Sequence, residues 1–250
     1  MPDGCADLVW DGTSVVFVGA RVDAGRFPVS ADAFNVGLRL RPGVAGAVAG
    51  ARASSLASGP VPLADLWDAR VVRRLESSLA GAGGAASHHR LLERSLSSRL
   101  DATGGPDPCV VSAARLLGRP GITVAGVASA VGLSARELRR RFPDHVGYGP
   151  KTLHRVLRFR RFLGWAPSVV AGRASLASAA AQAGYADQSH LGRDCRRLSG
   201  SSPAGLVARW AAAAGSGRNV PDPRRPWPAG WPAWLMTTTP PLANRRSGPT

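Results

Sequence analysis

The sequence predicts an α+β fold in which a small β-rich N-terminal domain precedes an all-α domain with two helix-turn-helix units and a disordered C-terminal tail. Three observations lead to this prediction. Short runs rich in β-branched and aromatic residues occur before residue 41, a helix-glycine-helix pattern occurs twice between Ile122 and Leu198, and basic residues are concentrated around that duplicated pattern.

The N-terminal part alternates strand-like runs with turn residues. The runs lie between Gly, Asp and Pro residues and predict strands at Leu8–Trp10, Val15–Val18 and Val36–Leu40. The Ala-rich stretch 44–56 predicts one short helix. Apolar residues at helical spacing over 68–100, interrupted by a Gly/Ala-rich break, predict a helix pair that either forms a spacer or dimerising element or packs against the sheet. We therefore expect a sensor-like domain over 1–67, followed by a helical spacer and linker over 68–107.

The first copy of the duplicated pattern begins at Thr123, which suits an N-cap position. Apolar residues then occur at i, i+3, i+4 and i+7, namely Val124, Val127, Ala128 and Val131. Gly132 predicts the turn. Ser134 and Glu137 predict a capping box, in which the hydroxyl and the carboxylate each accept from a free backbone N–H.

The second copy begins at Ser175 and repeats these positions. Its first helix is displaced by 52 residues, so that Leu176 corresponds to Val124, and Gly184 again predicts the turn. One extra residue follows. The second helices therefore correspond at an offset of 53 residues, which pairs Asp187 with Ser134, Leu191 with Leu138 and Cys195 with Phe142.

The outward positions of each second helix follow from its inward apolar positions and the helical period. They predict DNA-contacting side chains at Arg136, Arg139, Arg140, Ser189, His190 and Arg193. Arg140 and Arg193 correspond between the copies, and arginine pairs bidentately with guanine O6 and N7 in the major groove. The alternative is that these arginines contact only phosphate or solvent.

A basic helix is predicted between the two copies. Pro150 suits its first turn, and a helix from Pro150 to Trp165 would be roughly 24 Å long at about 1.5 Å per residue. We call the second helix of each copy its recognition helix. With the widths of the two recognition helices added, this length suits a distance between them of one DNA turn, roughly 34 Å. The expected phosphate contacts are Lys151, Arg155, Arg158, Gln188 and Arg196.

These residues resemble the AraC/XylS transcriptional regulators, whose DNA-binding domain has two helix-turn-helix units on a linker helix. The resemblance rests on residues 133–142, 149–151, 183–194 and 200–203. It implies that the second helix of each unit enters the major groove, with Arg136, Arg140, Ser189, His190 and Arg193 facing the bases. Cys195 departs from the phenylalanine that the family commonly has, which predicts a looser second unit.

Residues 2–10, 37–43 and 62–67 resemble the β-rich domain that precedes such DNA-binding domains in many actinobacterial regulators. This resemblance implies an effector-sensing or dimerising role. Asp7, Trp10 and Arg39 either line a pocket there or serve turns and packing. About three predicted strands are few for such a module, so we expect either a start assigned too late or a reduced sensor.

The charge distribution agrees with a DNA-binding C-terminal domain over 108–210. That segment holds 16 basic and 4 acidic residues, whereas residues 1–107 hold 11 of each. Such a positive field fits duplex DNA, RNA or an anionic membrane, and the duplicated pattern favours DNA. Because no apolar run or leader is found, we expect a cytoplasmic protein. Cys5, Cys109 and Cys195 are too scattered for a metal site, and no cofactor is predicted.

The sequence thus predicts an effector-responsive, sequence-specific transcriptional regulator rather than an enzyme. Double-stranded DNA is the predicted partner; RNA polymerase, a small effector and a second copy of the chain are candidates. The rivals are a non-specific DNA-packaging protein and a DNA-repair enzyme fused to such a domain, which would need activated cysteines. Residues 211–250, which contain Trp227, Trp231 and Trp234, are predicted to be disordered.

Overall fold

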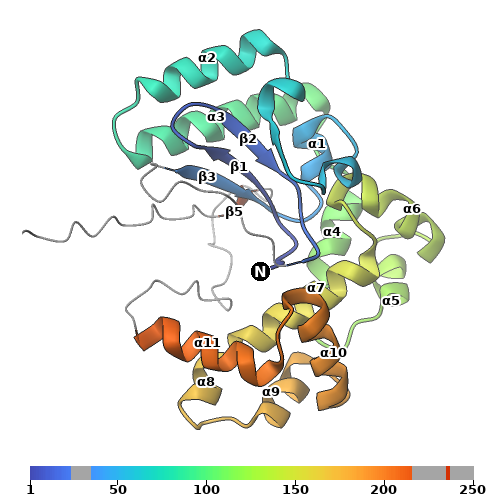
Figure 1. The fold of residues 1–250 in the computed structure, drawn as a ribbon. Coiled ribbons are helices and arrows are strands. Elements are labelled where there is room, and N and C mark those ends of the chain that lie inside the picture. Colours follow the sequence, from blue (N-terminus) through green and yellow to red (C-terminus); the bar gives the residue numbers. More distant parts are fainter. Residues whose placement is uncertain (24–34, 216–234, 237–250) are drawn as a thin grey trace, which may run out of the picture.

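The protein is described by a computed structural model that covers residues 1–23, 35–215 and 235–236 (Figure 1). It confirms the predicted α+β fold. The strands are β1 (Ala6–Trp10), β2 (Val15–Val18), β3 (Val36–Leu40), β4 (Pro60–Pro62) and β5 (Leu235–Met236). They form one antiparallel sheet in the order β4-β2-β1-β3-β5. The three predicted strands are confirmed, and the C-terminal region supplies β5 at the sheet edge.

The helix pair after residue 68 belongs to the N-terminal core. Helices α2 (Ala69–Ala80) and α3 (Ala85–Thr103) lie beside the sheet (Figure 1). Their inward residues join the strand residues in one buried cluster, including Leu8, Phe17 and Leu38 from the strands and Val72, Leu79, Leu92 and Leu96 from the helices. This cluster extends to Leu100, beyond the expected domain boundary at residue 67. The helix pair therefore packs against the sheet, which is the second of the two alternatives given above.

The single helix predicted over 44–56 is wrong. Helix α1 (Ala45–Ala49) ends at Gly50, whose φ of 71° is left-handed, and a separate 3-10 helix, η1 (Ala53–Leu56), follows. Glycine adopts this conformation without the penalty of a Cβ atom, so it terminates the helix early. A second 3-10 helix, η2 (Leu63–Asp65), leads to Trp67, whose indole donates to the Val48 carbonyl oxygen at 2.7 Å.

The all-α domain contains the predicted helix-turn-helix units. Its helices are α4 (Pro108–Leu116), α5 (Val124–Ala130), α6 (Ala135–Val146), α7 (Pro150–Gly164), α8 (Ala166–Val170), α9 (Leu176–Ala183), α10 (Gln188–Ser199) and α11 (Pro203–Gly215). We call α5 and α6 the first unit and α9 and α10 the second unit. All four predicted N-caps accept a backbone N–H: Thr123, Ser134, Ser175 and Asp187.

Each unit has its own hydrophobic core, and α7 contributes to both. Leu153 joins Leu138 and Phe142 in the first core, whereas Phe159 joins Leu191 in the second. Cys195 is fully buried in the second core, and this burial raises the pKa of its thiol to about 12. It therefore acts as a small core residue.

Helix α11 continues to Gly215, so its last five residues lie in the expected tail. The tail tryptophans Trp227, Trp231 and Trp234 lie outside the described residues. None of the described helices is both long and apolar enough to cross a bilayer.

Truncation of the corresponding core residue should lower the free energy of unfolding more in the first unit than in the second. Phe142→Ala removes a fully buried ring and should destabilise the first unit by about 3–5 kcal/mol. Cys195→Ala removes one sulphur atom and should cost clearly less. Urea unfolding followed by the helical circular dichroism signal measures both, and equal losses would contradict this difference.

Candidate nucleic-acid interface

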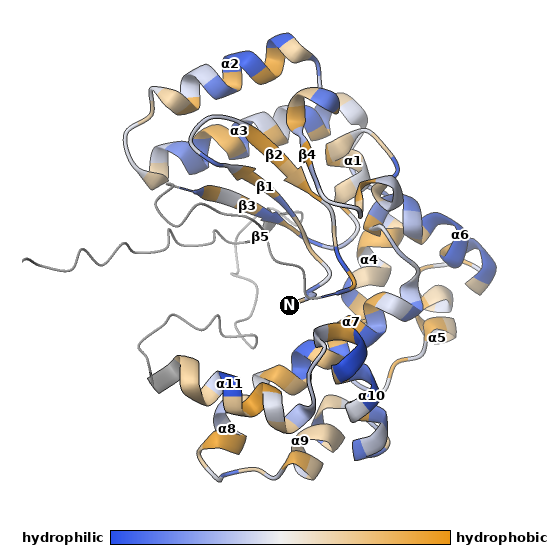
Figure 2. Cartoon of the chain, viewed as in Figure 1, coloured by the Kyte–Doolittle hydropathy of each residue, from blue (hydrophilic) through white to orange (hydrophobic). Residues whose placement is uncertain are grey.

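Helix α6 presents a basic outer face because its apolar residues fix its orientation. Ser134 Oγ accepts the Glu137 N–H at 3.0 Å and starts the helix. Leu138, Phe142 and Val146 follow at four-residue intervals and are buried. The three predicted contacts on the opposite side, Arg136, Arg139 and Arg140, are exposed. Hydrophilic residues accordingly cover the outer end of α6 in Figure 2.

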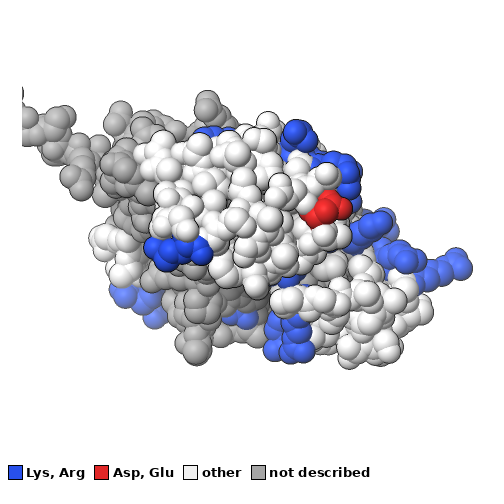
Figure 3. Space-filling view, turned by 90° about the horizontal axis from the view of Figure 1, so that it is seen from below, with Lys and Arg blue, Asp and Glu red and all other residues white. Residues whose placement is uncertain are grey.

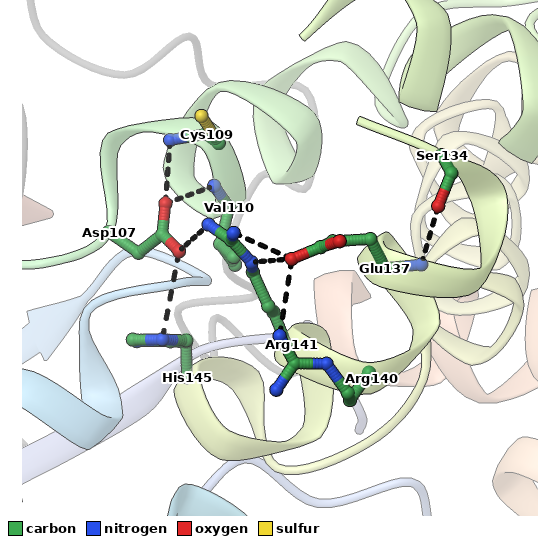
Figure 4. A network of polar contacts seen from close by, with 8 residues as sticks. All are labelled: Asp107, Cys109, Val110, Ser134, Glu137, Arg140, Arg141 and His145. Carbon is green, nitrogen blue, oxygen red and sulfur yellow. Dashed lines mark hydrogen bonds and ion pairs between the residues drawn. The ribbon is translucent and has the colours of Figure 1, made fainter. Parts of the chain in front are cut away.

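The carboxylate of Glu137 does not complete the predicted capping box. Its Oε1 instead accepts from Arg141 Nη2 at 2.7 Å and from Arg140 Nη2 at 3.1 Å (Figure 4). These hydrogen bonds, led by those from Arg141, lower the pKa of Glu137. The nearby guanidinium groups attract the carboxylate more strongly than the backbone N–H does.

Arg141 links the recognition helix to α4. Its Nη1 lies 3.4 Å from Oδ2 of Asp107, the N-cap of α4, whose Oδ1 accepts from the N–H groups of Cys109 and Val110 (Figure 4). Arg141 is not among the contacts predicted from the sequence. The signal was present, since glutamate followed by arginine four residues later pairs on a helix.

Helix α10 has the same construction. Asp187 Oδ1 accepts the His190 N–H, and Leu191, Cys195 and Leu198 are buried. The exposed side chains of Gln188, Ser189, Arg193 and Arg196 line an open groove of about 460 Å³. Ser202 and Pro203, where α11 begins, also line this groove. Four of the predicted contacts are therefore brought together on one surface.

A buried carboxylate attaches α10 to the linker helix. Asp194, whose side chain is 9% exposed, lies 3.3 Å from Arg155 Nε and 3.0 Å from Arg158 Nη2. Arg158 also lies 3.1 Å from His190 Nε2, and its guanidinium stacks 4.6 Å from the centroid of the Tyr185 ring. Arg155, Arg158 and His190 are thus turned towards Asp194, whereas the sequence analysis placed them against DNA.

Asp194 is not among the residues predicted from the sequence, although it is an acidic residue in a strongly basic domain. Its counterpart at the offset of 53 residues is Arg141, which has the opposite charge. Each recognition helix therefore carries a charged residue at this position, and each pairs with a neighbouring helix. The repeat preserves the position of the ion pair but reverses its polarity.

The two recognition helices lie on either side of α7. In Figure 1, α6 is at the right and α10 is below it, in the lower half and right of centre. Seen from below, lysine and arginine side chains gather along the right-hand part of this face (Figure 3). The predicted phosphate contact Lys151 is exposed at the start of α7. The exposed side chains are suited to a long polyanion.

Comparison with protein families matches residues 127–209 to the family described as a helix-turn-helix domain. The matched segment begins in α5 and ends in α11, so it includes both recognition helices and the linker helix. Searches of curated proteins and of solved structures found no match. The match supports an AraC-type helix-turn-helix domain over residues 127–209, of the kind found in DNA-binding transcription regulators.

Proposed function

We propose that the protein is a sequence-specific transcription regulator in which α6 and α10 enter two successive major grooves of one duplex. The observation that carries this proposal is the equivalence of Arg140 and Arg193. Both are exposed, both occupy the same position of a capped second helix, and α7 packs against both units. Over its 15 residues α7 is about 22 Å long, which suits recognition helices one DNA turn apart.

The exposed residues fall into two proposed roles. Arg140 and Arg193 contact guanine, and Arg136, Arg139 and Ser189 contact neighbouring base edges or phosphates. Lys151, Gln188 and Arg196 contact phosphate. Arg140 is 73% exposed, so its hydrogen bond to Glu137 is a surface contact that DNA can replace at little cost.

Arg155 and Arg158 fit a positioning role better than phosphate contact. Their guanidinium groups are engaged with Asp194, and their side chains are only 21% and 17% exposed. His190 lies in the same network. These side chains hold α10 at a fixed orientation on α7, so they act on DNA binding through Arg193 and Ser189.

The N-terminal domain is proposed to receive a small effector. An open hollow of about 350 Å³ between β1 and the turn from α2 to α3 is lined by Trp10, Leu79 and His88. Asp7 and Arg39 face each other across β1 and β3, with Oδ1 and Nε 2.9 Å apart, which favours a packing role for this pair. RNA polymerase and a second copy of the chain remain candidate partners.

Truncation of the two equivalent arginines should reduce specificity. Arg140→Ala and Arg193→Ala should each weaken binding to a selected DNA site by about 1–3 kcal/mol, because a bidentate guanine contact depends on sequence. Binding to random DNA should weaken much less. Both affinities are measured at several salt concentrations. Equal losses on the two DNAs would show that neither side chain contacts a base.

The Asp194 network separates a positioning role from phosphate contact. Arg158→Ala and Asp194→Asn should both weaken specific binding while leaving the slope of log affinity against log salt unchanged. Lys151→Ala is the control, and it should lower that slope by about one because a phosphate contact releases roughly one counterion. A lowered slope for Arg158→Ala would assign that residue to phosphate instead.

The rival function is non-specific DNA packaging, which is favoured by the basic surface alone. A packaging protein binds every duplex alike, whereas a regulator prefers a site over random DNA by about 10³-fold or more. Selection from a random duplex library followed by competition at fixed salt decides between them. Failure to enrich any sequence would support packaging.

A further inference from the structure

The N-terminal domain rests directly on the helices of the first unit. Helix α1 and η1 both pack against α6, the recognition helix. Gly43 approaches Val111 of α4, and Gly4 approaches Leu153 of α7. Val111 also packs against the N-terminal core, although it lies on α4. The N-terminal domain therefore touches three helices that build the first core.

The closest approach is between two backbones. A Cβ atom on Gly46 of α1 would overlap the backbone oxygen of Asp144, in the last turn of α6. Gly46 lies inside a helix and has no left-handed φ, so its conformation does not require glycine. Glycine within a helix is destabilising relative to alanine. The close contact with α6 explains its presence there.

Further contacts fix the end of α6 and the turn after it. Arg52 precedes η1, and its Nε lies 3.7 Å from Asp144 Oδ1. At Gly147, which ends α6 with a φ of 104°, an added Cβ would lie 3.4 Å from the Ala53 carbonyl oxygen. Tyr148 lies beside Gly4 of the N-terminal domain, and its buried hydroxyl has no hydrogen-bond partner among the described residues. The contact thus involves both backbone and side chains.

The second unit has a separate core. Every residue of the buried cluster around α10 comes from the segment between Val156 and Leu206, so in the described part of the chain it includes none from the N-terminal domain. Helix α10 packs on α7, α9 and α11, and Asp194 attaches it to α7. Of the two recognition helices, α6 is the one on which α1 and η1 rest.

We propose that the N-terminal domain positions the first recognition helix and leaves the second to α7, α9 and α11. A change in the N-terminal domain then moves α6 relative to α10 and alters binding at the half-site of α6. The regulatory signal is therefore delivered to one of two half-sites. The half-site part of this inference rests on the proposed function, because it requires both helices to contact DNA.

The direct test is Gly46→Ala in the full chain, with Gly83→Ala as the matched control. Gly83 lies in the same domain, and an added Cβ there meets nothing within 4 Å. The probe is a duplex that the unaltered chain selects from a random library. Arg140→Ala and Arg193→Ala first identify the half-site of each helix by the loss of protection in footprinting.

Gly46→Ala should weaken binding to this duplex by about tenfold or more, since overpacking shifts the backbone. Protection should be lost at the half-site of α6 and kept at that of α10, and Gly83→Ala should behave as the unaltered chain. Unchanged affinity, or equal loss at both half-sites, would overturn the proposal. If Gly46→Ala does not fold, Val111→Ala at the same junction replaces it. This variant should also lose protection at the half-site of α6 only, and unchanged affinity or equal loss at both half-sites would again overturn the proposal.

Hydrogen exchange of the free protein tests the positioning without DNA. Gly46→Ala, or Val111→Ala in its place, should speed exchange in α6 and leave α9 and α10 unchanged. Unchanged exchange in α6 would overturn the positioning role of the N-terminal domain, even if the variant still binds DNA. Failure of the unaltered chain to select any duplex, combined with faster exchange in α6, would refute the proposed function and leave the positioning of α6 supported.

Discussion

Helix α7 is the element on which the arrangement of the DNA-binding domain depends, because its buried side chains belong to two separate cores. Leu153, near its beginning, packs with Phe142, and Phe159, six residues later, packs with Leu191. A helix is stiff over this length, so packing on α7 holds the two units at a defined separation. The spacing of the recognition helices therefore depends first on α7.

The ion pairs at Arg141 and Asp194 complement this packing. Apolar contacts have no preferred direction, whereas a guanidinium bound to a carboxylate is directional. A buried ion pair contributes little net stability because its charges lose hydration. The value of the Asp194 pairs thus lies in orientation, since they hold α10 on α7 through Arg155 and Arg158. Arg141 does the same for α6 through Asp107 on α4.

The N-terminal domain adds a constraint to α6 alone. Its contact with Asp144 requires glycine at position 46, and its helices α2 and α3 fill the sheet core instead of reaching the second unit. Because of this asymmetry, the two similar units are held in place by different neighbouring elements. The first is held between the N-terminal domain and α7, and the second is held by α7 and its own neighbours. The proposed regulation through the N-terminal domain would act on that difference.

Local pattern determined much of this protein. The strands β1, β2 and β3, the caps at Ser134 and Asp187, and the exposed faces of α6 and α10 follow from periodicity and capping, which act over a few residues. Tertiary structure alone decided what distant residues do. It turned Arg158 towards Asp194, 36 residues away, and placed Gly46 against Asp144. A helical pattern shows which side chains point outward, but whether another element covers them depends on packing that the pattern does not contain.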